Sequence, residues 1–232
     1  MKRRGFIRLC AAVAGAASAQ ALATSDARPH RYTRSRLEVG GGRPLRAADI
    51  PVDRNLIFHY PYAATPCFLL NLGRPLSAPA ELKTAAAQSY RWPGGVGPGR
   101  SIVAYSAICA HQLAYPTRQI SFISYRTEKG VQNRFANVIH CCSEHSQYDP
   151  AHGARVVAGP APQPLAAILL EYDAAEDALY AVGTLGGEMF NAFFAKYAFK
   201  LGMERGNKAH DAVGTSTRVV ELDNYCRQQV RC

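Results

Sequence analysis

The sequence predicts a mainly β protein with one amphipathic helix near the C-terminal end. Two observations lead to this prediction. Short runs of β-branched and aromatic residues recur along the chain, and segments rich in glycine and proline separate them. Only after residue 186 do the apolar residues recur at three and four positions, which indicates a single late amphipathic helix.

Residues 1–23 have the pattern of a targeting segment. Lys2, Arg3 and Arg4 precede an alanine-rich stretch without acidic residues, which ends in an Ala-x-Ala pattern before Thr24. This arrangement resembles the twin-arginine export signal, which implies a periplasmic protein that is exported folded. The alternative interpretation is the basic start of an ordinary helix. The stretch is too short and too often interrupted to predict a membrane span.

The chain has 27 Lys and Arg residues against 17 Asp and Glu residues, a formal net charge of +10. Part of that excess lies in the targeting segment, and the remainder is spread without a basic run or an aromatic platform. This distribution argues against a nucleic-acid partner.

The elements are expected in the following order. Residues 24–50 are polar, basic and glycine-rich and should form an extended arm. Residues 51–185 should form the main domain, with strands at 55–60 and 67–72, a short helix at 79–88, and a hairpin of 165–172 with 178–182. Residues 186–232 should form a helix over 188–204 and a polar tail. Trp92 should lie in the core. Five apolar residues should form the buried stripe of the helix: Phe190, Phe193, Phe194, Tyr197 and Leu201.

Two fragments within 101–162 carry residues that bind metals. Cys109-Ala-His111 follows a strand-like run at 101–108, and Cys142-Ser-Glu-His145 follows another at 134–140. Two thiolates and two imidazoles on two loops can hold a zinc ion or a histidine-ligated iron–sulfur cluster. Tyr148-Asp149 and the stiff loop Gly159-Pro-Ala-Pro162 follow the second fragment.

This combination resembles the Rieske 2Fe–2S family over about residues 101–182. The resemblance implies an antiparallel β-sandwich with a small cluster-binding subdomain. It also implies one 2Fe–2S cluster per chain, held by Cys109, His111, Cys142 and His145, with no catalytic residues. Histidine ligation places the potential of such clusters between about −150 and +300 mV. Serine and tyrosine donors near the sulfurs, Ser143, Ser146 and Tyr148, would raise it. His140 and His152 flank the site outside the pattern and are expected in solvent.

The sequence departs from the family pattern in three places. Ala114 and Glu144 stand where many members carry a disulfide between the cluster loops. An insert at about 115–132 lengthens the separation between the two ligand fragments and is expected to form an additional hairpin. Tyr148 lies one residue nearer to the second histidine than the pattern has it.

Four cysteines remain outside the leader and the proposed ligands: Cys67, Cys141, Cys226 and Cys232. In an exported protein they could form two disulfides, Cys226–Cys232 and Cys67–Cys141, or they could remain buried thiols. Cys141 is the rival of Cys142 as a ligand. We prefer Cys142 because it gives the C-x-x-H spacing and leaves Cys141 on the other face of the strand.

The expected function is one-electron transfer in the periplasm, as an accessory subunit of an oxidoreductase that passes electrons to a cytochrome or copper protein. The resemblance favours the small subunit of an arsenite-oxidase-like enzyme, with a molybdenum-containing catalytic partner. One alternative is the Rieske subunit of a cytochrome bc-type complex, which would meet the membrane through an uncleaved leader. The other is a zinc-stabilised binding module without a redox role.

Overall fold

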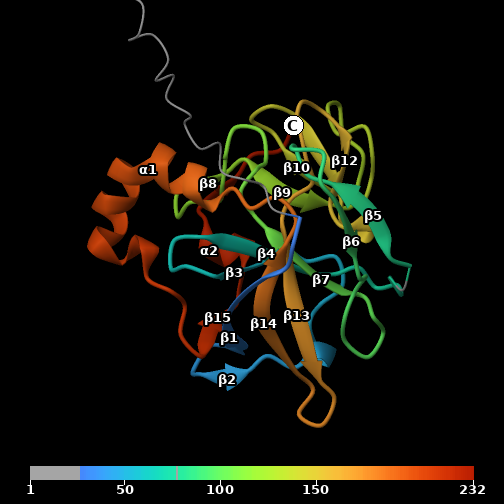
Figure 1. The fold of residues 1–232 in the computed structure, drawn as a ribbon, viewed down its shortest axis with the longest axis vertical. Helices are drawn as coiled ribbons and strands as arrows, with labels where there is room; N and C mark the ends of the chain where they lie inside the picture. The colour runs from blue at the N-terminus through green and yellow to red at the C-terminus, as the bar shows by residue number, and fades with distance from the viewer. Residues whose placement is uncertain (1–26, 77) are drawn as a thin grey trace, which may run out of the picture.

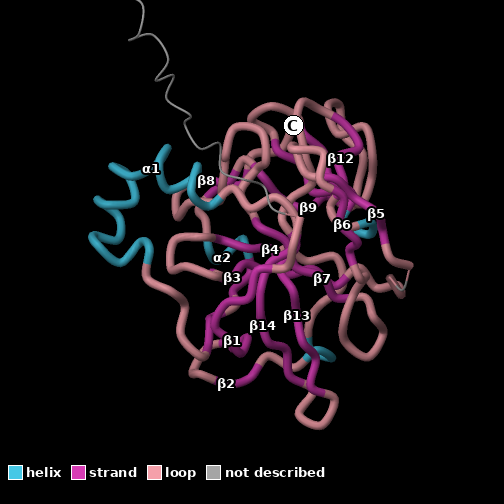
Figure 2. The backbone as a smooth tube through the Cα atoms, in the orientation of Figure 1, coloured by secondary structure: helices cyan, strands magenta, loops and turns pink. Residues whose placement is uncertain are grey.

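The computed structural model describes residues 27–76 and 78–232 and shows a mainly antiparallel β protein with one long helix, as the sequence predicts (Figures 1 and 2). The predicted targeting segment lies outside the described residues. Across the described chain, none of the helices is both long and apolar enough to cross a lipid bilayer.

The main sheet has nine strands in the order β15-β1-β14-β13-β7-β4-β3-β16, with β2 paired to β1. All pairs are antiparallel except β1 with β15. The strands are β1 (His30–Val39), β2 (Arg43–Pro44), β3 (Leu56–His59), β4 (Pro66–Asn71), β7 (Ile102–Ser106), β13 (Ala167–Asp173), β14 (Ala178–Leu185), β15 (Ser216–Arg218) and β16 (Val220–Glu221).

A second sheet carries the segment with the candidate ligands. Its order is β12-β11-β10-β9, all antiparallel, and it lies above the main sheet in Figure 1. Its strands are β9 (Ile123–Arg126), β10 (Val138–Cys141), β11 (Ser146–Asp149) and β12 (Arg155–Ala158). Two further pairs complete the β structure, β5 (Ala80–Lys83) with β6 (Ser89–Trp92) and β8 (Ile120–Ser121) with β17 (Gln228–Gln229). The helices are α1 (Phe190–Arg205), α2 (Leu222–Tyr225) and the 3-10 turns η1 (Ala47–Asp49), η2 (Pro150–His152) and η3 (Gly206–His210).

Strand alternation gives the main sheet a core on each face. Along β4, Phe68 and Leu70 pack in the cluster that continues to Cys109 and Tyr148, whereas Leu69 packs on the opposite side with residues such as Phe58. Both faces are therefore covered, and the face of Phe68 supports the candidate site.

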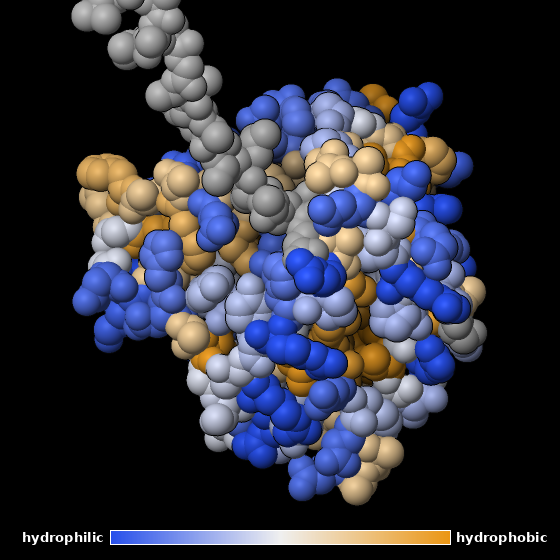
Figure 3. All heavy atoms as spheres, viewed as in Figure 1, coloured by the Kyte–Doolittle hydropathy of each residue, from blue (hydrophilic) through white to orange (hydrophobic). Residues whose placement is uncertain are grey.

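Helix α1 buries its aromatic residues against its own domain, as predicted. Phe190, Phe193, Phe194 and Leu201 are buried and Tyr197 is half-buried, against Ile108 and the neighbouring loop. The opposite side of α1 remains apolar and exposed: Phe199 is 83% and Met203 75% exposed, and apolar residues gather on this helix in Figure 3.

Several local expectations were wrong. Residues 79–88, expected to form a short helix, form β5 and a turn. Leu82 in β5 and Tyr90 in β6 are both buried in the core, so the apolar spacing is that of a hairpin. Residues 30–39 form β1, inside the main sheet, where an arm was expected. The main sheet thus runs across the expected boundaries at residues 50 and 185. In the insert, β8 pairs with β17 and β9 with β10, so the two strands do not pair with each other.

The strand and core predictions elsewhere agree with the structure. The strands expected at 55–60 and 67–72 are β3 and β4, and the hairpin expected at 165–182 is β13 with β14. Trp92 is buried, with 3% of its surface exposed.

Candidate metal centre

The first candidate loop follows β7 and folds back on itself. The Cys109 nitrogen donates to the Ala114 carbonyl at 2.8 Å, and the Leu113 nitrogen donates to the Cys109 carbonyl at 3.0 Å. Leu113 adopts a positive φ of 61°, which closes this tight turn. Cys109 is fully buried as a result, whereas His111, at the bend, is partly exposed.

Helix α1 supports this loop from behind. The Tyr115 and Phe193 rings meet edge to face with their centroids 4.8 Å apart. The Lys196 ammonium donates to the Gln112 carbonyl at 2.6 Å. The helix therefore fixes the backbone that carries His111.

The second candidate loop connects β10 to β11. Cys141 is the last residue of β10 and lies opposite Ser146, the first residue of β11. His145 turns the chain with a positive φ of 57°, and the Cys142 nitrogen donates to the Phe122 carbonyl at 2.6 Å. Backbone hydrogen bonds to the insert and the pairing of β10 with β11 thus set the position of the loop.

The Gly159-Pro160-Ala161-Pro162 segment packs directly on the second loop. A Cβ atom at Gly159 would lie 2.5 Å from the His145 carbonyl oxygen, and Gly159 has a φ of +87°. Only glycine permits this approach and this backbone conformation together.

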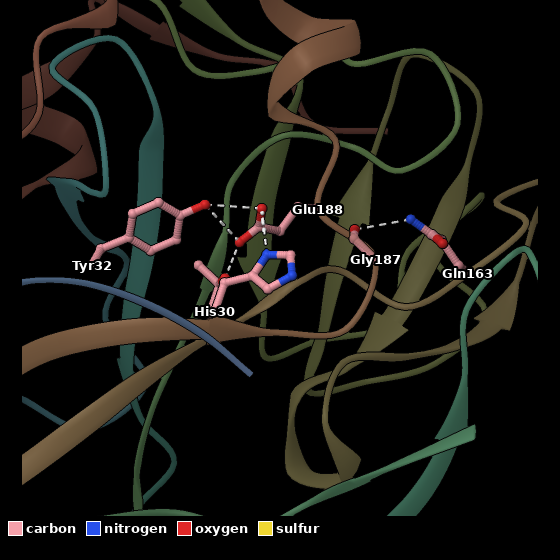
Figure 4. Close-up of polar contacts among 6 residues, drawn as sticks. His30, Tyr32, Gln163, Gly187 and Glu188 are labelled. Carbon is pink, nitrogen blue, oxygen red and sulfur yellow. Dashed lines mark hydrogen bonds and ion pairs between the residues drawn. The ribbon is translucent and has the colours of Figure 1, made fainter. Parts of the chain in front are cut away.

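A buried glutamine anchors the end of the proline segment. Gln163 accepts a hydrogen bond from the Ala85 nitrogen at 2.9 Å. It donates one to the Gly187 carbonyl, also at 2.9 Å (Figure 4). The adjacent Glu188 accepts a hydrogen bond from Tyr32 and lies 3.1 Å from His30 Nδ1. The proline segment is therefore tied to the junction between β14 and α1.

The structure brings Cys109 and Cys141 together as a buried pair of thiols. They share a hydrogen bond, and the Tyr148 hydroxyl lies 3.2 Å from Cys109 Sγ. The hydrogen bond from Cys141 lowers the pKa of Cys109, and the Tyr148 hydroxyl and two backbone N–H groups lower it further. The pKa of Cys141 is raised, because it donates that hydrogen bond and is buried. The pair is thus arranged to stabilise thiolate charge.

Cys142 is taken out of the predicted ligand set by a disulfide. It is bonded to Cys232, across a sequence separation of 90 residues, and a disulfide sulfur is not a thiolate ligand. Cys141 replaces it beside Cys109. The predicted pairings Cys226–Cys232 and Cys67–Cys141 were wrong, and Cys67, Cys141 and Cys226 are buried free thiols.

The signal that identifies Cys141 lies in the spacing to Tyr148. A C-x-x-H pattern that began at Cys141 would place the histidine at position 144, but the histidine is His145. It therefore stands one residue farther from Cys141 and one residue nearer to Tyr148 than the pattern has it. The two differences cancel, so the separation of cysteine from tyrosine is unchanged. Cys142 was preferred because it has the C-x-x-H spacing to His145, but His145 is the residue whose position departs from the pattern.

The predicted histidine ligands have the environment that a metal-binding imidazole needs. The Nδ1 atoms of His111 and His145 are both buried and have no hydrogen-bond partner among residues 27–76 and 78–232. Buried polar atoms are normally paired, so each of these nitrogens is poised for a group the protein itself does not provide. Together with two adjacent thiols, the donor set fits the two-sulfur, two-nitrogen ligation of a histidine-ligated 2Fe–2S cluster.

The other predicted residues differ in their environments. Ser146 Oγ is buried and has no partner in the part of the chain that the structure describes, and Ser143 is exposed. His152 is exposed and paired with Asp149, as expected for a solvated residue. His140 is wholly buried, contrary to the expectation, because β10 turns it away from Cys141 and beneath the C-terminal segment. Burial lowers the pKa of His140 to about 4, with His145 and Arg126 adding to the effect.

Two comparisons with known proteins complete the description. No family model matches the sequence. Among solved structures, the chain is similar to the soluble domain of the Rieske protein II (soxF) from Sulfolobus acidocaldarius. The TM-score is 0.42 with 25% sequence identity, over 66% of this chain and 93% of that chain. The functional assignment of this protein therefore depends on the chemistry of its two loops.

Proposed function

We propose that this protein is a one-electron carrier that binds a 2Fe–2S cluster through Cys109, Cys141, His111 and His145. The observation that carries the proposal is that the same two loops hold two paired, buried thiols and two histidines whose buried Nδ1 atoms have no partner within the described chain. Such a cluster, when bound, accepts and releases one electron.

The protein groups around Cys109 favour the more negative, reduced state. Tyr148 lies within hydrogen-bond distance of Cys109 Sγ, and the backbone N–H groups of His111 and Gln112 donate to the same sulfur. The backbone N–H groups of Ser143 and Glu144 do the same for Cys141. Donors to a ligand sulfur stabilise added negative charge, so they raise the potential.

The histidine side of the site provides the route for the electron. Cys109 and Cys141 are fully buried, with 0% of their surface exposed, whereas His111 and His145 are partly exposed. A partner that docks on the two loops would approach the imidazoles first, and the thiols would remain shielded from water.

The cellular role follows from the targeting segment together with this site. We propose a periplasmic accessory subunit that serves a molybdenum-containing catalytic oxidoreductase of the arsenite-oxidase-like kind and passes electrons to a cytochrome or copper protein. Lys2, Arg3 and Arg4 support export of the folded chain. Sequencing the N-terminus of the exported protein separates this role from that of a cytochrome bc-type subunit held by an uncleaved leader.

The test is to purify the full chain after export and to examine it before and after dithionite. A cluster with two histidine ligands gives a coloured protein and, on reduction, a paramagnetic signal. A zinc-bound module would be colourless and silent, and that result would refute the proposal.

Paired variants test the ligand set. Cys141→Ser should abolish the iron content and the signal, whereas Cys142→Ser should retain both, because only Cys141 lies beside Cys109. The opposite result would return Cys142 to the ligand set. Cys226→Ser serves as the control for loss of a buried thiol elsewhere.

A further inference from the structure

A second group of metal-binding side chains lies on the other face of β10. The ligand atoms of His140, His145 and Cys232 all lie within 4.8 Å of one another. The disulfide places Cys142 Sγ next to Cys232 Sγ, so a second sulfur adjoins the group. The His140 and His145 ring centroids are 5.8 Å apart.

His140 is the residue that the cluster does not explain. Its side chain is wholly buried, and within the described chain its hydrogen-bond partner is the Cys232 sulfur, 3.6 Å from Nδ1 and 3.7 Å from Nε2. A disulfide sulfur is a weak acceptor, so the imidazole is poorly satisfied for a group removed from water. A polar ring held in this way beside two sulfurs is suited to a metal ion.

We propose that opening the Cys142–Cys232 disulfide creates a zinc site formed by Cys142, Cys232, His140 and His145. A dithiol reductant supplies two electrons and two protons, its own sulfurs form a disulfide, and Cys142 and Cys232 become thiols. A zinc ion then displaces the two thiol protons. The product contains two thiolates, two neutral imidazoles and one divalent cation, so its net charge is zero and burial carries little electrostatic penalty.

The donor set selects the class of ion. It contains sulfur and nitrogen without a carboxylate, which favours zinc over magnesium or calcium. Tetrahedral zinc places its ligand atoms about 3.3 to 3.8 Å apart. The widest separations in the group, up to 4.8 Å, must therefore shrink by roughly an ångström, and the two sulfurs, bonded to each other in the disulfide, must separate. His140 is fixed in β10, whereas His145 lies in a loop and Cys232 at the end of the described chain, and these two can move toward it.

Three of the four zinc ligands, Cys142, Cys232 and His140, are not ligands of the proposed cluster. His145 is the shared residue, so the two occupants exclude one another. While the disulfide is closed, His145 is available to bind the cluster. After the disulfide is reduced, His145 binds zinc instead. The state of one disulfide would thus decide which metal centre the second loop builds.

The test uses cobalt(II) as the probe, because tetrahedral cobalt with thiolate ligands is strongly coloured. Full-length protein carrying Cys109→Ser, which disables the cluster ligands and leaves the proposed site intact, is divided into oxidised and phosphine-reduced samples. The reduced sample should bind one cobalt per chain with tetrahedral thiolate bands, and zinc should displace it. The oxidised sample should show none.

Variants in the same background assign the ligands. Cys232→Ser and His140→Gln should each lose the bands, whereas Cys226→Ser and His152→Gln should retain them. Mapping the Cys142–Cys232 disulfide in oxidised His140→Gln shows that the variant still folds. Equal cobalt binding in the oxidised chain, unchanged bands in His140→Gln, or no binding after reduction would each overturn the proposal. Because the cluster ligands are already disabled, none of these results bears on the proposed electron-transfer function.

Discussion

The Tyr148 hydroxyl lies 3.2 Å from Cys109 Sγ and accepts a hydrogen bond from the Ala110 nitrogen at the same distance. Tyr148 stands on β11 and Cys109 follows β7, so this contact joins the small sheet to the main sheet at the candidate site. Burial and the nearby Cys109 raise the pKa of Tyr148 well above its usual value, which keeps the hydroxyl protonated and able to donate.

Replacing Tyr148 with phenylalanine should lower the reduction potential of the iron-loaded protein. The reduced state loses a donor to a ligand sulfur, a difference of about 1 kcal/mol, or roughly 40 mV for a one-electron couple. Protein-film voltammetry measures the shift. The matched control is Tyr90→Phe, a buried tyrosine in β6, which should leave the potential unchanged. An unaltered potential in Tyr148→Phe would contradict the assigned hydrogen bond.

Replacing Cys232 with serine should destabilise the folded protein. The disulfide closes a loop with a sequence separation of 90 residues, and loss of such a bridge costs between about 2 and 5 kcal/mol. Chemical denaturation in metal-free, non-reducing buffer gives the free energy of unfolding. Adding reductant should lower the free energy of unfolding of the wild type to that of the variant. A persistent difference under reducing conditions would show that the serine acts in another way.

Replacing Gly159 with alanine should displace the second loop and weaken cluster retention. The new methyl group would lie 2.5 Å from the His145 carbonyl oxygen at a φ of +87°, and we expect a loss of at least about 2 kcal/mol. Thermal unfolding and iron content measure the effect. Gly202→Ala is the control, because nothing lies within 4 Å of its added Cβ, and it should stabilise α1 by about 0.5–1 kcal/mol. Equal behaviour of the two variants would contradict the close packing.

Acid should unfold the protein partly through His59. Burial, with the positive charges of Arg205 and Arg118, lowers the pKa of His59 to about 3. Between its usual value near 6.5 and about 3, the unfolded chain binds a proton that the folded chain does not. The free energy of unfolding should therefore fall as the pH falls through this window, by up to about 1.4 kcal/mol per pH unit.

The variant His59→Gln isolates that contribution. Glutamine can still accept a hydrogen bond from Arg205, which lies 3.2 Å from His59 Nε2, but it does not titrate. Denaturant midpoints measured from pH 7 to pH 4 should depend less steeply on pH than in the wild type. His152→Gln, at an exposed position, should keep the wild-type dependence. Identical slopes in His59→Gln and the wild type would exclude this residue as the source.

Local patterns in the sequence were sufficient for the strands and the helix near the site. Alternation placed β3, β4 and the β13–β14 hairpin, and the aromatic spacing placed α1, because these elements are determined by which side chains reach the core. The two loops were found because cysteine and histidine next to strand ends are rare outside metal sites.

Long-range covalent and hydrogen-bonded pairing could not be predicted in the same way. Whether Cys141 or Cys142 pairs with Cys109 depends on the disulfide partner of Cys142. That partner, Cys232, reaches Cys142 because β17 pairs with β8. The assignment of 79–88 as a helix failed because a short apolar spacing fits either a helix or a hairpin until its neighbours are known.

The position of β1 has a consequence for the order of folding. This strand, His30–Val39, lies between β14 and β15, whose residues come about 150 and 180 positions later in the chain. Such distant pairing makes assembly slow, because a long stretch must be closed before the strands stabilise one another. The sheet beneath the two loops cannot be completed while only the first part of the polypeptide has been synthesised. An excised fragment spanning 101–162 would lack this foundation, so we expect the proposed cluster to be inserted only into a chain synthesised at least as far as β15.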